Sequence, residues 1–155
     1  MTHRIRLRRP WTREIFRDGQ SLHRADRVNV PDASANDVVS MAEVSDAQDG
    51  QGEESSAEYH AIYRRHFNCP TGLEASDQLS IEIVPALQDH FVVRLNEVVI
   101  GSGDPSEAGQ QDSNLLRVPQ PLKGQNQIEI ELRSQTQSDL PRCVAEVALR
   151  IDAAS

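Results

Sequence analysis

The stretch that most constrains the fold is a β-hairpin pattern over Phe91 to Gly103, which reads FVVRLNEVVIGSG. Apolar residues recur at every second position, at Phe91, Val93 and Leu95. They stop at Asn96 and Glu97 and then resume before a Gly-Ser-Gly exit. Two antiparallel strands joined by a two-residue turn produce this pattern. The rest of the chain is therefore expected to supply strands that pair around this hairpin.

Several other segments have the two-residue period of strands. The clearest are residues 59–67, 79–83, 127–133 and 144–151, each bounded by turn-forming residues. A further strand is expected over 4–11, where Pro10 ends the pairing, and shorter ones around Ile15, over 27–30 and over 115–118. No segment has a helical period. The sequence predicts an all-β fold, an antiparallel jelly-roll β-sandwich of about eight to nine strands, in one domain spanning residues 1–155.

One long stretch departs from this pattern. Residues 33–58 contain seven acidic residues and no basic one, and they are otherwise mostly Ser, Ala, Gly and Gln. Such a composition predicts a disordered acidic loop inserted into the domain. Lengthening a surface connection from about six to about 26 residues costs only about 1.3 kcal/mol in closure entropy, so a sandwich tolerates the insertion.

The charge distribution argues against several classes of partner. A net charge of −8 disfavours affinity for nucleic acid and for anionic membranes. Eight arginines lie in residues 1–27, but Arg4, Arg6 and Arg8 alternate with Ile5 and Leu7. This alternation is typical of the wet face of a half-buried strand. We therefore expect neither a nucleic-acid site nor a membrane surface.

No apolar run approaches the eighteen or so residues of a membrane span, and no apolar signal core follows the first arginines. A cytoplasmic location is the resulting expectation. Cys69 and Cys143 are too few and too far apart in sequence for a zinc site, and free thiols are expected in a reducing compartment. Whether these two cysteines approach each other stays open.

The order of the motifs resembles the N-terminal sugar-binding domain of glycoside hydrolase family 2, a galactose-binding-like jelly roll. The segments that carry the resemblance are Val28-Asn29-Val30-Pro31, Tyr63-Arg64-Arg65-His66-Phe67, Pro70-Thr71-Gly72-Leu73, Leu79 to Ile83, Arg94-Leu95-Asn96-Glu97 and Leu122 to Ile130. Together they cover about two-thirds of the chain. The chain also looks like small stand-alone versions of this domain that begin with an Arg-rich strand ending in Pro-Trp. The resemblance implies a galactose-binding-like sandwich with affinity for sugars.

Two departures from the family pattern matter. Glu97 stands where the family has glycine, and a positive φ there costs a non-glycine residue about 1 kcal/mol or more, so we expect a different type of turn. The catalytic barrel of these hydrolases has no counterpart in this sequence. Glycosidase activity therefore does not follow from the resemblance.

The residues offer little catalytic chemistry. Glu129 and Glu131 share one strand face, but a solvated face gives their pKa values no reason to diverge, as hydrolysis of a glycoside requires. His60 and His66 also share a face, yet one strand supplies no third metal ligand. Nucleophile motifs, phosphate loops and dinucleotide fingerprints are missing from the sequence. We expect a protein that is not an enzyme, without catalytic residues, metal or cofactor.

Binding is the better-supported class of function. A sandwich can bind a sugar with an aromatic ring that stacks on it and with polar groups that bond its hydroxyls. The predicted ligand-binding residues are Trp11, Tyr59, Tyr63, Arg64, Arg65 and His66. Core packing competes for the aromatic ones, since the chain has only six aromatic residues, and cross-strand ion pairs compete for Arg64 and Arg65. The alternative is a protein-interaction or assembly module that uses sheet edges or the acidic loop.

Overall fold

The computed structural model describes residues 1–32, 58–104, 112–134 and 141–154, and these form ten strands and no helix. The strands are β1 (Thr2–Arg6), β2 (Trp11–Arg17), β3 (Gln20–Val28), β4 (Tyr59–Asn68), β5 (Gln78–Val84), β6 (His90–Leu95), β7 (Val98–Gly103), β8 (Asn114–Arg117), β9 (Gln125–Ser134) and β10 (Glu146–Asp152). The predicted disordered acidic loop at 33–58 lies, apart from Glu58, outside the described residues.

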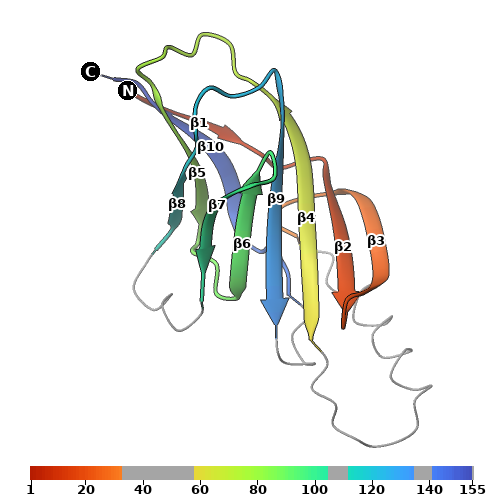
Figure 1. Ribbon diagram of the computed structural model, residues 1–155. Helices are drawn as coiled ribbons and strands as arrows, with labels where there is room; N and C mark the ends of the chain where they lie inside the picture. The colour runs from red at the N-terminus through yellow and green to blue at the C-terminus, as the bar shows by residue number, and fades with distance from the viewer. Residues whose placement is uncertain (33–57, 105–111, 135–140, 155) are drawn as a thin grey trace, which may run out of the picture.

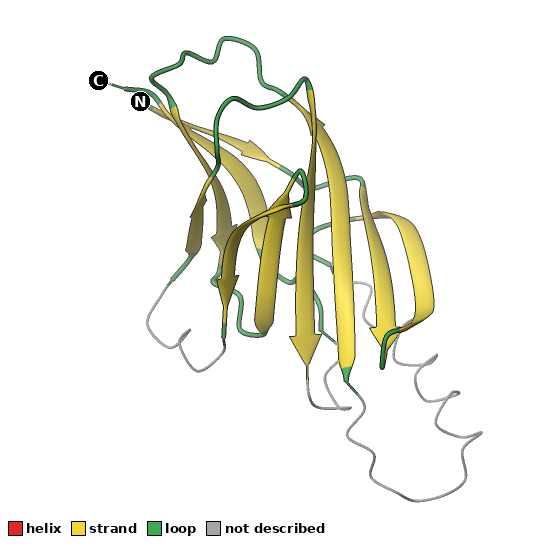
Figure 2. Cartoon of the chain, viewed as in Figure 1, coloured by secondary structure: helices red, strands yellow, loops and turns green. Residues whose placement is uncertain are grey.

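The strands form two antiparallel sheets that face each other, as Figures 1 and 2 show. The larger sheet has the order β3-β2-β4-β9-β6-β7, and the smaller one has the order β1-β10-β5-β8. The pairing of β1 with β10 brings the two ends of the chain together (Figure 1). The predicted all-β sandwich is confirmed, with ten strands instead of eight to nine.

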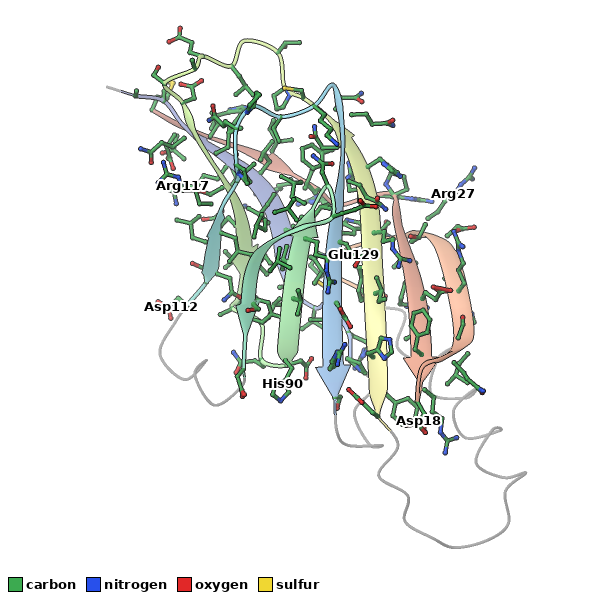
Figure 3. The ribbon with its side chains drawn as sticks, in the orientation of Figure 1. Asp18, Arg27, His90, Asp112, Arg117 and Glu129 are labelled. Atoms are coloured by element: carbon green, nitrogen blue, oxygen red, sulfur yellow. The ribbon has the colours of Figure 1, made fainter. Side chains whose placement is uncertain are left out.

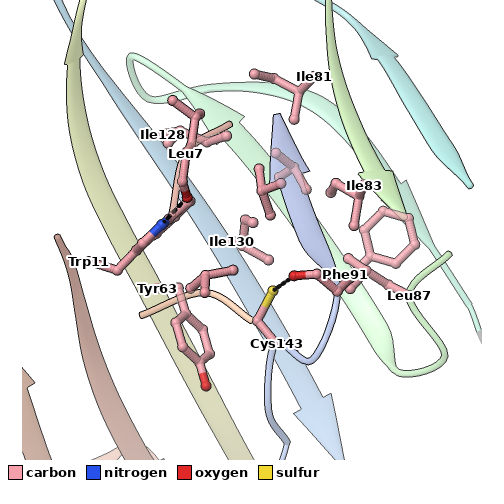
Figure 4. Close-up of a cluster of buried hydrophobic side chains, with 14 of the residues drawn as sticks. Leu7, Trp11, Tyr63, Ile81, Ile83, Leu87, Phe91, Ile128, Ile130 and Cys143 are labelled. Atoms are coloured by element: carbon pink, nitrogen blue, oxygen red, sulfur yellow. Dashed lines mark hydrogen bonds between the residues drawn. The ribbon is translucent and has the colours of Figure 1, made fainter. Parts of the chain in front are cut away.

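Period-two alternation places the core between the sheets. Along β4, Tyr59, Ala61, Tyr63 and Phe67 are buried, and the predicted inward residues of β5, β6 and β9 are buried as well. Figure 4 shows part of this cluster, in which Ile81 and Ile83 of one sheet lie across from Ile128 and Ile130 of the other. Each fully buried aliphatic side chain stabilises the fold by about 1.5–3 kcal/mol, so this cluster is the main source of stability.

The strand predicted over 4–11 is wrong in its extent. Strand β1 ends at Arg6 in the smaller sheet, and Trp11 begins β2 in the larger sheet. Pro10 cannot donate to a ladder, and the chain crosses between the sheets just before it. The Trp11 indole Nε1 donates to the carbonyl oxygen of Leu7 at 2.6 Å, which holds the crossing in place. The short strands expected around Ile15 and over 27–30 are in fact longer, as β2 and β3.

The arginines of β1 lie on the outer side of the smaller sheet. Arg4 pairs with Glu82 of β5 and with Glu146 of β10, and Nε of Arg6 lies 3.6 Å from Glu146. Ile5 and Leu7 turn inward and Leu7 is buried. The alternation of these residues therefore belongs to a half-buried strand, as predicted.

The hairpin turn differs from the prediction. Asn96 and Glu97 both have positive φ, 50° and 71°, which is the signature of a type I′ turn, so Glu97 does not impose another turn type. The Asn96 side chain explains this: its Nδ2 donates to Oδ1 of Asn126 at 2.9 Å, and its Oδ1 accepts from the backbone N–H of Gln127 at 2.9 Å. Hydrogen bonds from Asn96 to the first residues of β9 thus stabilise the turn that gives Glu97 its unfavourable conformation.

A polar cluster is buried inside the sandwich. Nη1 of Arg13 lies 2.6 Å from Oδ2 of Asp32, and the Tyr63 hydroxyl donates to the same oxygen at 2.7 Å. The backbone N–H of Asp32 donates to the carbonyl oxygen of Cys143 at 2.8 Å. Burial and then the Asp32 carboxylate raise the pKa of Tyr63. The cluster therefore joins β2 and β4 to the segment before β10.

Candidate functional site

The outer face of the larger sheet carries a row of charged side chains from neighbouring strands. Alternation along β4, β9 and β6 turns Arg64, Glu129, Glu131 and Arg94 away from the core. Strand β9 lies between β4 and β6, so that Glu129 stands opposite Arg64 on one side and Arg94 on the other. The charges on this face therefore alternate across the strands.

These side chains form a continuous series of ion pairs, which we call the charge ladder. Its members are Glu14, Arg64, Glu129, Arg94, Glu131 and Arg133. Glu129 is 2.8 Å from Nε of Arg64 and 3.0 Å from Nη1 of Arg94. Glu131 is 3.0 Å from Arg94 and 2.8 Å from Nη2 of Arg133. Glu14 ends the ladder, 3.7 Å from Nη1 of Arg64.

Glu131 is the most enclosed carboxylate of the ladder. Burial pushes its pKa upward, but hydrogen bonds from Arg133 and Arg94 and their positive charges outweigh burial and leave the pKa below the usual value. The group is therefore an ionised acceptor at neutral pH. A general acid of a glycosidase needs the opposite shift.

A pocket of about 600 Å³ opens beside this end of the ladder, between β6, β7 and β9. We call it the β6–β9 pocket. Its polar lining consists of Glu58, His90, Ser102, Asp104, Glu131 and Arg133. Nδ1 of His90 lies 3.7 Å from Oδ2 of Asp104, and Figure 3 shows His90 at the end of β6. Phe91 and Val92 add an apolar part to the wall, so the pocket has the mixed lining of a small-molecule site.

The three predicted aromatic ligands are core residues. Trp11 and Tyr63 are 0% exposed and Tyr59 is 1% exposed, so none of them offers a ring face to a sugar. Phe67 and Phe91 are also buried. The remaining aromatic residue, Phe16, is half-buried and stacks on His60 with ring centroids 4.6 Å apart. Core packing, the competing interpretation, holds for Trp11, Tyr59 and Tyr63.

The three predicted polar ligand-binding residues, Arg64, Arg65 and His66, do not form one site. Arg64 belongs to the charge ladder, where its guanidinium forms ion pairs with Glu14 and Glu129. Arg65 and His66 line a different pocket, of about 420 Å³, near the Asn68 end of β4, whereas Glu58 precedes the other end. This pocket, here called the Arg65 pocket, is also lined by Ile5, Leu7, Asn68 and Gln125. The predicted single site over residues 63–66 is therefore divided between two faces of β4.

Sequence reasoning missed the polar lining of the β6–β9 pocket. The alternation of Phe91, Val93 and Leu95 indicated that His90 faces outward, which was an available signal. His90 lies beside Arg133 because β6 pairs with β9, where these two residues are register partners. Predicting this contact requires knowing that pairing. Strand pairing over this sequence separation is not encoded in local periodicity.

Within the described ranges no group of three or more His, Cys, Asp or Glu side chains could hold a metal ion. Cys69 and Cys143 are free thiols, and burial raises the pKa of Cys143 to about 12. The part of the chain that the structure describes contains no helix long and apolar enough to cross a membrane.

No protein-family model and no curated protein matches the sequence. The fold is similar to part of the FMN-binding β-glucuronidase from Facaelibacterium prausnitzii L2-6, with a TM-score of 0.60, 17% identity, and coverage of 97% of this chain and 22% of that one. It is also similar to part of the rhamnosidase from Novosphingobium sp. PP1Y, with a TM-score of 0.60, 15% identity, and coverage of 98% and 15%. The chain thus spans less than a quarter of either glycosidase, and it shares with them the fold of a β-sandwich segment.

Proposed function

We propose that this chain is a non-catalytic carbohydrate-binding module and that the β6–β9 pocket is its binding site. The observation that carries the proposal is the convergence of Glu58, His90, Ser102, Asp104, Glu131 and Arg133 around one pocket. Carboxylates accept hydrogen bonds from sugar hydroxyls, while arginine donates to them and histidine and serine do both. The likeness of the fold to parts of two glycosidases and the resemblance to a sugar-binding domain support the same class of ligand.

The electrostatics support binding rather than hydrolysis. Glycoside hydrolysis uses one carboxylic acid with a raised pKa and one carboxylate beside the scissile bond. Glu131 has a lowered pKa, and Glu129 is held between Arg64 and Arg94. Both carboxylates therefore act as ion-pair partners.

The experiment is a ¹⁵N NMR titration of the full chain with a panel of neutral mono- and oligosaccharides at millimolar concentration. We expect shifts that saturate at the backbone amides of His90, Ser102 and Arg133. His90→Ala should weaken binding about tenfold, the loss expected for one hydrogen bond of about 1.4 kcal/mol. His3→Ala, the same change at an exposed histidine of β1, should leave binding unchanged. A panel that moves no resonance in this pocket would contradict the proposal.

An assembly module is the second candidate, favoured by one observation at the sheet edges. Val98 and Val99 of β7 and Leu115 of β8 are each more than half exposed, and β7 and β8 are edge strands of their respective sheets. Exposed apolar edges are where strands add to one another. Light scattering after size exclusion tests this. A dimer that Val99→Lys converts to a monomer would favour assembly, and a wild-type monomer at high concentration would exclude assembly through these edges.

The acidic loop is the other surface that an interaction module could use, and apart from Glu58 it lies outside the described residues. A pull-down with residues 40–57 deleted tests that loop separately.

A further inference from the structure

The Arg65 pocket takes no part in the sugar binding proposed for the β6–β9 pocket, and it contains an arginine side chain that points inward. Arg65 has the same strand parity as Tyr63 and Phe67, so its side chain points toward the space between the sheets and not toward the charge ladder. There it meets Ile5 and Leu7, which belong to the opposite side of the sandwich. A cation therefore stands beside apolar side chains at the open end of the space between the sheets.

No carboxylate of the described residues pairs with the guanidinium of Arg65. Its Nε and Nη1 are enclosed and have no hydrogen-bond partner among the described residues. None of the described residues that line the pocket is acidic. This is unusual in a chain with a net charge of −8, whose other interior-facing arginine, Arg13, is paired with Asp32. An enclosed charge without a partner is unfavourable, and an anion that enters the pocket removes that penalty.

The remaining lining restricts the anion. The pocket is also lined by Asn68 and Gln125, which carry amide groups, and by His66, which carries an imidazole. Ile5 and Leu7 supply an apolar wall. Arginine recognises planar carboxylates through parallel N–H donors. Burial also lowers the pKa of Arg65, the direction expected for a cation that has lost water and gained no counter-charge.

We propose that the Arg65 pocket binds a small organic carboxylate, with the carboxylate on Arg65 and the apolar body of the ligand against Ile5 and Leu7. The site is separate from the β6–β9 pocket, because no residue lines both. The two proposals therefore stand or fall independently.

The test uses benzoate as the probe and benzamide as its neutral counterpart of the same shape. In a ¹⁵N NMR titration of the full chain, benzoate should shift the Arg65 Nε–H resonance and the backbone amides of Asn68 and Gln125. Benzamide should bind about tenfold more weakly or worse, since hydrogen bonds to a charged group are worth more than neutral ones. Equal responses to the two probes, or none to benzoate at about 50 mM, would overturn the proposal.

Variants localise the effect. Arg65→Met should weaken benzoate binding by about tenfold or more, whereas Arg117→Met, the same change at an exposed arginine of β8, should not alter it. If Arg65→Met does not fold, Arg65→Lys keeps the charge and loses the planar donors, and an intermediate affinity is expected. Benzoate binding that survives substitution of Arg65 would refute this site. A stronger response of the same amides to inorganic phosphate than to benzoate would refute the proposal that the ligand is a carboxylate.

Discussion

The hydroxyl of Tyr63 donates a hydrogen bond to Oδ2 of Asp32 at 2.7 Å, deep between the two sheets. The same oxygen pairs with Arg13, which is 2% exposed, while Asp32 is 3% exposed. Residue 63 belongs to the segment that resembles a sugar-binding motif, yet its polar end is occupied by this internal contact. The motif at this position thus contributes to stability, and a ligand does not reach it.

The first prediction concerns this buried pair. Asp32→Leu should lower the free energy of unfolding by about 3–5 kcal/mol, because it removes the carboxylate 2.6 Å from the buried Arg13 guanidinium. The double variant Arg13→Met with Asp32→Leu should lose clearly less, since no uncompensated charge remains. Urea unfolding of both variants measures the difference. A double variant less stable than Asp32→Leu alone would contradict this account of the cluster.

The second prediction concerns the register of β6. Leu95 is buried at 4% exposure, and Leu95→Ala should cost about 2–5 kcal/mol in unfolding free energy. Its register partner Val98 is 56% exposed, so Val98→Ala should change stability by about 0.5 kcal/mol or less. Chemical denaturation of the two variants under identical conditions is the measurement. Similar losses at both positions would mean that the inward face of β6 is misassigned.

The third prediction concerns the positive φ of Glu97. Glu97→Gly should raise the free energy of unfolding by up to about 1 kcal/mol, because glycine adopts a φ of 71° without the Cβ penalty. Glu97→Ala is the matched control, since it removes the charge and keeps the Cβ, and it should give no such gain. Thermal unfolding followed by circular dichroism distinguishes the two. A gain with alanine equal to that with glycine would assign the effect to charge.

The fourth prediction concerns pH. The pKa of Glu131 is lower in the folded state than in the unfolded chain, where it is about 4.3. Its contribution to stability is therefore present above that unfolded value and is lost as pH falls through the folded pKa. Glu131→Gln should flatten the loss of stability below about pH 5, and Arg133→Met should flatten it in part. Urea unfolding between pH 7 and pH 3 measures these slopes, and an unchanged slope in Glu131→Gln would refute the assignment.

Local periodicity was sufficient for most of the strands. The alternation over 59–67 and 127–133 correctly identified the buried faces of β4 and β9, because a strand with one face in the core must alternate. It failed where the chain changes sheets: residues 4–11 continue the pattern, but Pro10 and the contact of Trp11 with Leu7 divide them between β1 and β2. A period of two does not record which sheet a strand joins.

The candidate site followed less directly from the sequence. Residues such as Arg65 and His66 were identified, but their neighbours in the Arg65 pocket come from both sheets, and only the folded chain brings them together. The sequence determined that this chain forms a sandwich with a hairpin over Phe91 to Gly103, since those features depend on local turn and strand preferences. The hairpin lies at the edge of the larger sheet, so the other strands do not pair around it as expected. The tertiary structure decided which polar groups are paired, which are buried and which face a pocket, because strand pairing between distant segments sets the surroundings of each side chain.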